Sequence, residues 1–160
     1  MPKNLPSDEL REAIEQHQKF VNSAMIEKQY RLSLTDRKLH GLSLRGERLL
    51  GAQFTRCAFH GCDLSGVDLS FAVLTDCVIN DVILRGAVLY QSSLVACGFS
   101  YTNFSGALMT AAKISDAQFA SCEFFGVRWA GSSLEYCNFA SCNGTDFFGG
   151  DIMFYKTKMI

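Results

Sequence analysis

Residues 62–71 read CDLSGVDLSF, two five-residue units that place aspartate, leucine and serine at the same positions. Their leucines, Leu64 and Leu69, belong to a longer series. From residue 34 to residue 139 every fifth residue is apolar, which makes 22 apolar residues in register. Internal repeats outweigh local secondary-structure signals, because each repeat is one structural unit of a larger array. The sequence therefore predicts a repeat protein.

A chain that turns a corner every five residues explains this spacing. Neither an α-helix nor a long β-strand keeps every fifth residue on one face, because their periods are about 3.6 and 2 residues. On a short extended stretch, the large apolar residue (position i) and the residue at i−2 point inward, whereas the residue at i−1 points outward. Positions i+1 and i+2 form the corner. Nine of the 13 glycines fall at i+2, where glycine gives the backbone conformational freedom.

All seven cysteines fall at the small inward position i−2. They are Cys57, Cys62, Cys77, Cys97, Cys122, Cys137 and Cys142. Thiols on neighbouring coils are about 4.8 Å apart, which exceeds the usual Cβ separation in a disulfide. Side chains that point side by side into an apolar core cannot converge on a metal ion. We therefore expect reduced, buried cysteines with a structural role.

The units CDLSG, VDLSF, TNFSG and CNFAS resemble the A(D/N)LXX unit of pentapeptide-repeat proteins, with Asp63, Asp68, Asn103 and Asn138 in the polar second place. The resemblance covers about residues 34 to 154. It implies an all-β solenoid, a right-handed quadrilateral parallel β-helix with four units per coil, so that residues four units apart stack. The chain departs from the pattern at several i−1 positions, where apolar residues replace Asp or Asn: Val73, Val78, Ile83, Val88 and Leu108.

Stacking of every fourth unit predicts columns inside the solenoid. One column contains Cys57, Cys77, Cys97 and Cys137, and another contains Phe59, Phe99, Phe119 and Phe139. Twenty-two units make about 5.5 coils, and a spacing of about 4.8 Å between strands gives a rod about 25 Å tall.

Three segments are expected along the chain. Residues 1–31 form an N-terminal segment in which Ser7 caps a helix of about residues 8–25, and this helix covers the open end of the first coil. Residues 32–154 form the β-helix. Gly144 and Gly149 interrupt the apolar series, and an insertion of three residues near 141–144 restores the match at Phe147 and Ile152.

Residues 155–160 form an apolar tail with two possible roles. Either the tail caps the last coil, or it forms a homodimer contact, because the last coil exposes unpaired backbone groups. The resemblance favours the dimer, since family members often pair through their C-terminal ends. The candidate contact residues are Phe147, Phe148, Phe154, Tyr155 and Met159.

Composition and motifs argue against several classes of function. The chain is 48% hydrophobic and 19% charged with a net charge of −1, unlike a disordered chain or a basic nucleic-acid binder. Its first ten residues contain no apolar run of the kind found in signal peptides, and nowhere do 18 apolar residues follow one another, so we expect a cytoplasmic protein without a signal peptide or membrane span. No nucleotide-binding loop or nucleophile elbow occurs. We expect His17 to pack against the first coil. His40 and His60 are too few ligands for a zinc site. Together with the missing motifs, this leads us to expect neither an enzyme nor a cofactor or metal site.

The outward surface carries the candidate function. Four successive apolar i−1 residues, Val73 to Val88, form a belt around one coil, and a contiguous exposed apolar patch often marks a contact site. The candidate partner surface is the side formed by Phe71, Val73, Val88, Tyr90 and Leu108, edged by Arg48 and Arg128.

Two functions follow from this surface and from the charge of the chain. The preferred one is a non-enzymatic scaffold or protein–protein interaction module of a bacterial cytoplasm. The alternative, implied by the resemblance, is a DNA mimic that binds DNA gyrase or another topoisomerase, because residues 61–160 carry nine acids against five Lys or Arg. Direct nucleic-acid binding is not expected.

Overall fold

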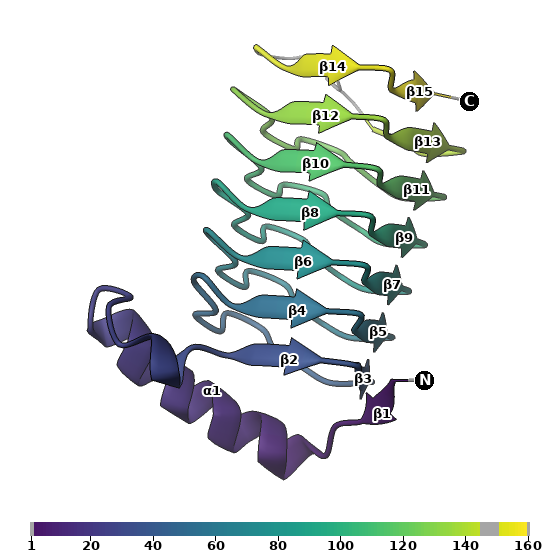
Figure 1. Ribbon diagram of the computed structural model, residues 1–160. Coiled ribbons are helices and arrows are strands. Elements are labelled where there is room, and N and C mark those ends of the chain that lie inside the picture. The colour runs from purple at the N-terminus through teal and green to yellow at the C-terminus, as the bar shows by residue number, and fades with distance from the viewer. Residues whose placement is uncertain (1, 145–150, 160) are drawn as a thin grey trace.

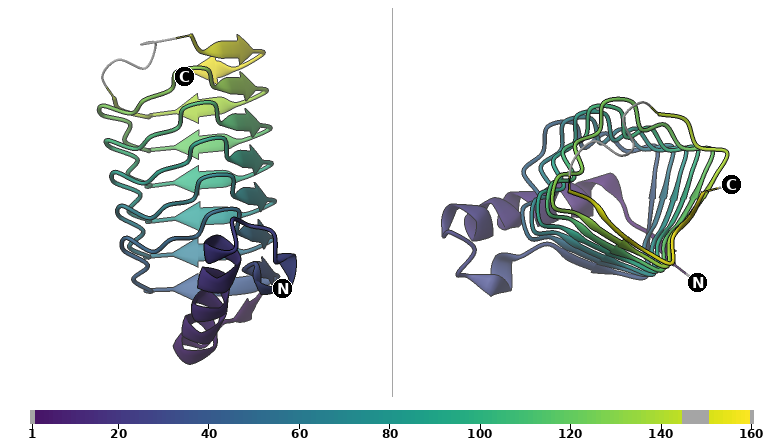
Figure 2. Two further views of the ribbon diagram at one scale, coloured as in Figure 1. Left: turned by 90° about the vertical axis from the view of Figure 1, so that its left-hand side faces the viewer. Right: turned by 90° about the horizontal axis from the view of Figure 1, so that it is seen from above.

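The computed structural model describes residues 2–144 and 151–159. The chain winds into a tower of stacked coils, with its N-terminus at the base and its C-terminus at the top (Figure 1). Viewed along the tower axis, successive coils nearly superimpose (Figure 2). The predicted fold class, a four-sided parallel β-helix with an N-terminal helix, is confirmed.

Two sides of the tower are parallel β-sheets of short strands. The seven-stranded sheet contains β2 (Ser33–Thr35), β4 (Gln53–Thr55), β6 (Val73–Thr75), β8 (Ser93–Val95), β10 (Lys113–Ser115), β12 (Ser133–Glu135) and β14 (Met153–Tyr155). The eight-stranded sheet contains β1 (Lys3–Asn4), β3 (Arg37–His40), β5 (Ala58–His60), β7 (Val78–Asn80), β9 (Gly98–Ser100), β11 (Gln118–Ala120), β13 (Asn138–Ala140) and β15 (Lys158–Met159).

The other two sides are joined by single β-bridges. One bridge joins Asp63 to Ile83 on the third side, and another joins Val88 to Leu108 on the fourth. In each bridge the two partners lie four units apart in the sequence, as do the sheet partners Leu34 and Phe54. This four-unit offset means that each five-residue unit occupies one side of a four-sided coil.

Burial follows the predicted unit. The apolar i residues from Leu34 to Phe139 are buried, and they form one core with small i−2 residues such as Ala87 and Cys97. The corner position i+2 has a positive φ along the tower, for example 64° at Gly66 and 53° at Asp76. This left-handed conformation is disfavoured for residues with a Cβ, which explains the enrichment of glycine there.

The helix α1 (Ser7–Asn22) lies beneath the first coil, followed by the short 3-10 helix η1 (Lys28–Tyr30). Its buried side chains include Leu10 and Phe20, and Phe20 packs against Gly51 of the first coil. The strand β1 adds a rung below β3, pairing Lys3 with Arg37. The N-terminal end of the solenoid is therefore covered by its own chain.

The predicted ends of this helix differ from the observed ones. The helix begins at Ser7 itself, Pro6 occupies the N-cap, and no side chain caps the end. It stops at Asn22, three residues before the predicted end. Ala24 and Met25 have φ values of 55° and 63°, and residues in this left-handed region end a helix.

The prediction of a three-residue insertion near residues 141–144 is wrong for the described residues on either side of it. Asn143 bridges to Glu123, and β14 pairs with β12 so that Phe154 lies beside Leu134. The four-unit offset therefore resumes unchanged, because the backbone ladder continues from coil to coil. Ile152 occupies the small inward position and Phe154 the large one, while Phe147 lies outside the described residues.

Candidate interaction surface

The fourth side of the tower carries a vertical row of outward side chains, which we call the side row. It consists of Arg48, Asp68, Val88, Leu108 and Arg128, joined by successive β-bridges. Because each residue occupies position i−1 of its unit, each side chain points away from the core. The row has apolar residues at its centre and an exposed arginine at each end.

Two aromatic residues enlarge the apolar centre of the side row. Tyr90 follows Val88 on the same stretch of chain and is 40% exposed, as is Phe71 at the corner of the coil below. Their rings meet edge to face with centroids 5.7 Å apart. Val73 lies beyond the corner, where it is half-buried. The structure thus brings together all the predicted partner-surface residues around one corner, with Arg128 at the upper edge.

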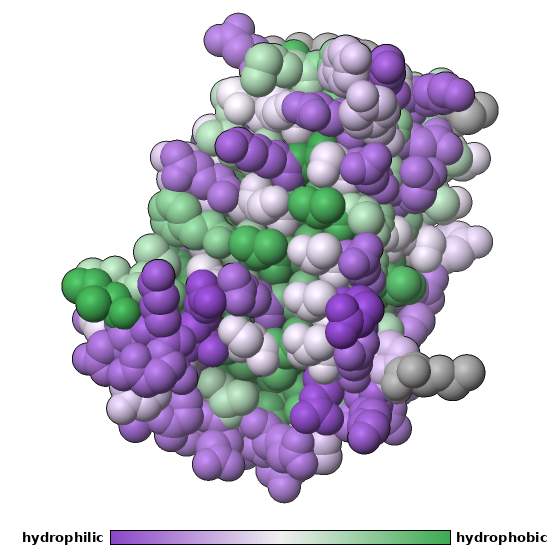
Figure 3. Space-filling model, in the orientation of Figure 1, coloured by the Kyte–Doolittle hydropathy of each residue, from purple (hydrophilic) through white to green (hydrophobic). Residues whose placement is uncertain are grey.

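The rest of the apolar belt does not belong to this surface. Val78 lies on β7 and Ile83 on the third side, so the four belt residues occupy four different sides. Both are more exposed than Val88, at 50% and 42%. Seen from the side of the seven-stranded sheet, apolar residues gather at mid-height among hydrophilic ones (Figure 3).

The last coil forms a second apolar region. Phe154 and Met159 are 38% and 46% exposed, because β14 and β15 are the last strands of their sheets among the described residues. The ring of Tyr155 meets that of Tyr136 at 5.3 Å, and the Lys156 ammonium lies 5.2 Å from the Tyr155 ring centroid. Sequence reasoning missed Lys156, which belongs to the tail itself, and Tyr136, which becomes a neighbour of the tail only through the four-unit offset. Phe147 and Phe148 lie outside the described residues.

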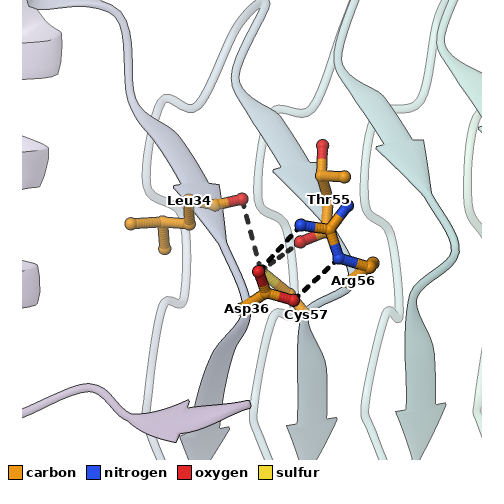
Figure 4. A network of polar contacts seen from close by, with 5 residues as sticks. All are labelled: Leu34, Asp36, Thr55, Arg56 and Cys57. Carbon is orange, nitrogen blue, oxygen red and sulfur yellow. Dashed lines mark hydrogen bonds and ion pairs between the residues drawn. The ribbon is translucent and has the colours of Figure 1, made fainter. Parts of the chain in front are cut away.

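The cysteines are free thiols, buried except for the half-buried Cys142. Their thiols donate to backbone carbonyls, as in the contact of Cys57 Sγ with the Leu34 oxygen at 3.4 Å (Figure 4). Burial raises the pKa of Cys62 and Cys137, and raises that of Cys122 to about 12. A protonated, enclosed thiol is a poor nucleophile and a poor metal ligand.

An ion pair at the corner between the two sheets joins neighbouring coils. Arg56 donates two hydrogen bonds of 2.8 Å to the Asp36 carboxylate, one coil below (Figure 4). This hydrogen bonding lowers the pKa of Asp36. The pair is exposed and joins neighbouring coils, so it stabilises their stacking only slightly.

The histidines fall into two environments. His17 is buried, and its Nδ1 accepts a hydrogen bond from the Leu32 backbone N–H at 2.9 Å. Its Nε2 lies near the Leu50 backbone but forms no hydrogen bond with any described residue. His40 and His60 lie side by side on β3 and β5. Within the described ranges, no three His, Cys, Asp or Glu side chains are grouped so as to hold a metal ion.

The hollows of the molecule are of two kinds. An apolar void of about 20 Å³ lies in the core beside Ile79, Phe59 and Phe99. An open groove of about 580 Å³ runs between α1 and the first coil, past Leu10 and Leu42. None of the described helices is long and apolar enough to cross a membrane.

Comparisons with known proteins agree with this architecture. A family model described as pentapeptide repeats matches eight copies over residues 34–70 and 72–110. The chain belongs to the pentapeptide-repeat family. No curated protein matches the chain in sequence.

Three solved structures are similar to this chain at low sequence identity. Rfr23, a pentapeptide-repeat protein from the cyanobacterium Cyanothece 51142, has a TM-score of 0.51 and 15% identity over 77% of this chain and 88% of its own. QnrB1, a plasmid-mediated fluoroquinolone resistance protein, has a TM-score of 0.42 and 13% identity over 80% and 84% of the two chains. HetL from the cyanobacterium Nostoc sp. strain PCC 7120, involved in heterocyst differentiation regulation, has a TM-score of 0.23 and 15% identity over 81% and 86%.

Proposed function

We propose that this protein is a non-enzymatic interaction module that binds another protein through the side row and its aromatic flank. The observation that supports this function is an apolar cluster at one corner of the rod, in which the exposed rings of Phe71 and Tyr90 lie beside the half-buried Val88 and Leu108. Burying such a cluster against a partner removes apolar surface from water, which is the main driving force of association. The core side chains are used for stacking, so the outer surface is where specificity resides.

Aspartate substitutions test this proposal. We expect the double variant Val88→Asp, Leu108→Asp to lose binding at least tenfold, because two carboxylates would have to be desolvated in the contact. Asp68 already occupies the equivalent place one coil below, so the fold accommodates aspartate there. Circular dichroism should remain that of the wild type.

Ile83→Asp is the matched control, since Ile83 is exposed on another side of the same coil. A protein that co-purifies with the wild type and with Ile83→Asp, but not with the double variant, and that rebinds after purification, is the expected partner. Equal retention by all three chains would contradict the proposed surface.

Topoisomerase binding by DNA mimicry is the alternative function, favoured by the excess of acids in residues 61–160. Repeating phosphate-like charge would require columns of acids. The column with the most acids lies at one corner and holds Asp36, Asp76 and Asp116, but Arg56 and Ala96 stand between them, so its charge does not repeat from coil to coil. A supercoiling assay with purified gyrase separates the two functions, because a mimic inhibits or protects the enzyme and a scaffold leaves its rate unchanged.

We further propose that two copies pair through the last coil. The edges of β14 and β15 present backbone groups to which another chain can bind, and Phe154, Tyr155 and Met159 surround these edges. The other end is covered by β1 and α1. Pairing of like ends therefore closes into a two-fold dimer and cannot grow into a filament.

A further inference from the structure

The side row has a charge pattern that restricts its partner. From the base upward it reads Arg48, Asp68, Val88, Leu108 and Arg128, so cations flank the apolar centre. Lys113, on the neighbouring sheet, adds a third exposed cation near the upper edge. The one carboxylate of the row, Asp68, already accepts a hydrogen bond from the Ser70 backbone N–H at 3.0 Å. The rim of the apolar centre is therefore net positive.

We infer that the side row binds an amphipathic helix of a partner protein, with carboxylates near both ends of its apolar stripe. This inference rests on the proposed function, since it names the partner of the same surface. Carboxylates of the partner would pair with Arg48 and Arg128, and guanidinium–carboxylate pairs are short, directional hydrogen bonds. Apolar residues between them would cover Val88, Leu108 and the rings of Phe71 and Tyr90.

The backbone of this side excludes pairing with an added β-strand. The Val88 N–H donates to the Val67 carbonyl and the Leu108 N–H to the Ala87 carbonyl, both at 2.9 Å. The Leu108 carbonyl in turn accepts from the Leu89 N–H at 2.7 Å. These backbone groups are used between coils, so a partner must bind through its side chains.

The spacing of the row fits a helix. Coils repeat at about 4.8 Å and helical turns at about 5.4 Å, so a helix parallel to the rod axis presents about one turn to each coil. Four steps separate Arg48 from Arg128, a span of about 19 Å. That span corresponds to about 13 helical residues. Apolar residues at i, i+4 and i+7 with acids about 11 or 14 residues apart, which lie on the same face of a helix, would match the row.

Charge disfavours a second copy of this chain on the same surface. Two-fold pairing in either direction would place each end arginine of one copy opposite an end arginine of the other. In the antiparallel arrangement it would also place Asp68 opposite Leu108, which would bury a carboxylate against a methyl group. Like charges and unpaired buried charges at an interface oppose association.

A display library of helical 18-residue peptides with random surface positions tests the inference on the full-length protein. We expect enriched peptides to carry apolar residues at helical spacing with an excess of Asp and Glu at both ends. A synthesised, fluorescein-labelled member should bind the Arg48→Glu, Arg128→Glu variant at least tenfold more weakly, by fluorescence anisotropy. The matched control is Lys38→Glu, which reverses an exposed cation on β3 of the eight-stranded sheet and should leave binding within twofold.

The outcomes separate this inference from the proposed function. Enriched peptides could require Val88 and Leu108 and yet be neutral or basic, or bind equally well without Arg48 and Arg128. Either result would overturn the inference of an acidic amphipathic helix but would leave the proposed partner surface supported. Failure to enrich any peptide that depends on Val88 and Leu108 overturns the inference and counts against the surface as well. A wild-type oligomer that the Val88→Asp, Leu108→Asp substitutions dissociate, measured by light scattering, assigns the row to a second copy and overturns the inference.

Discussion

A recurrent hydrogen bond connects the small inward residue of one coil with the coil below. Cys62 donates to the Leu39 carbonyl at 3.4 Å, Thr102 to that of Ile79 at 3.4 Å and Ser132 to that of Met109 at 2.6 Å. In each case the acceptor belongs to the large apolar residue 23 positions earlier. Cysteine therefore combines small volume with a weak donor, which explains why it shares this position with serine and threonine.

Burial of the thiols predicts their reactivity. With iodoacetamide at pH 8, we expect the folded protein to be modified at Cys142 alone, and the urea-unfolded protein at all seven cysteines, by mass spectrometry. Cys97 is the informative case, because a hydrogen bond with the Cys77 thiol lowers its pKa while its side chain is only 1% exposed. Rapid modification of Cys97 in the folded protein would show that the core opens between coils.

His17 predicts a loss of stability in acid. Burial, aided by the positive charge of Arg31, lowers its pKa to about 4 from an ordinary value of 6.5. Between these pH values the unfolded chain binds a proton that the folded chain does not. The free energy of unfolding therefore falls as the pH falls from 6.5 to 4, by about 3 kcal/mol.

Urea denaturation at pH 7, 5.5 and 4.5 measures this loss. His17→Asn is the comparison, because its side-chain oxygen can accept the Leu32 N–H and does not titrate in this range. We expect the variant to be less stable at pH 7 and to depend less on pH. Parallel pH profiles for the two proteins would exclude His17 as the source.

At the scale of elements, one interior column contains a packing fault. Phe99, Phe119 and Phe139 stack with centroids 4.8 and 4.5 Å apart, whereas Ile79 interrupts the series beside the void of about 20 Å³. We expect Ile79→Phe to fill this void and extend the ring stack. The gain is about 1 kcal/mol of unfolding free energy, measurable by thermal denaturation.

Ile114→Phe provides the contrast. Ile114 is buried in the neighbouring column and does not line the void. The same enlargement should therefore overpack the core and destabilise it by about 1–3 kcal/mol. If Ile79→Phe and Ile114→Phe destabilise the protein equally, the void beside Ile79 cannot accommodate a phenyl ring, which would contradict the prediction.

The elements differ in how far the sequence determines them. The unit from Leu34 to Phe139 was predictable residue by residue, because each large side chain and each small one has a single place in a five-residue turn. The C-terminal register was not, since either Ile152 or Phe154 could supply the large inward residue. Only the backbone ladder between β12 and β14 decides this. The pairing of Lys3 and Asn4 with β3 could not be predicted from the sequence, because two exposed polar residues show no periodicity.

The five-residue unit likewise determines the partner surface only in part. Outward positions were predictable from the unit, so the neighbourhood of Val88, Leu108 and Tyr90 followed from the stacking of every fourth unit. The edge-to-face contact of Phe71 with Tyr90 depends on rotamers and was not predictable. What binds this surface depends on a partner whose chemistry the repeat does not constrain.

For the whole molecule, the exposed last coil predicts the state of association. We expect the wild type to be a dimer in sedimentation equilibrium, and Phe154→Glu, Tyr155→Asp to weaken the dimer at least tenfold by placing charges at the contact. Val78→Asp, an exposed substitution on a side of the rod, should leave the dimer intact. A monomeric wild type, or a dimer that survives the C-terminal substitutions, would contradict end-to-end pairing.

The coil, built of four equivalent units, gives insertions and deletions an unusual effect. Removing one unit between Leu89 and Leu94 would keep every later inward side chain inward, so the core and the register of the unit would survive. The upper coils would nevertheless turn by a quarter relative to the lower ones. Arg128 would then lie on a different side from Arg48, and the two would no longer flank one apolar row. Length changes of a whole coil would lengthen or shorten the rod while preserving every face, whereas changes of a single unit would rearrange its surface without disturbing its core.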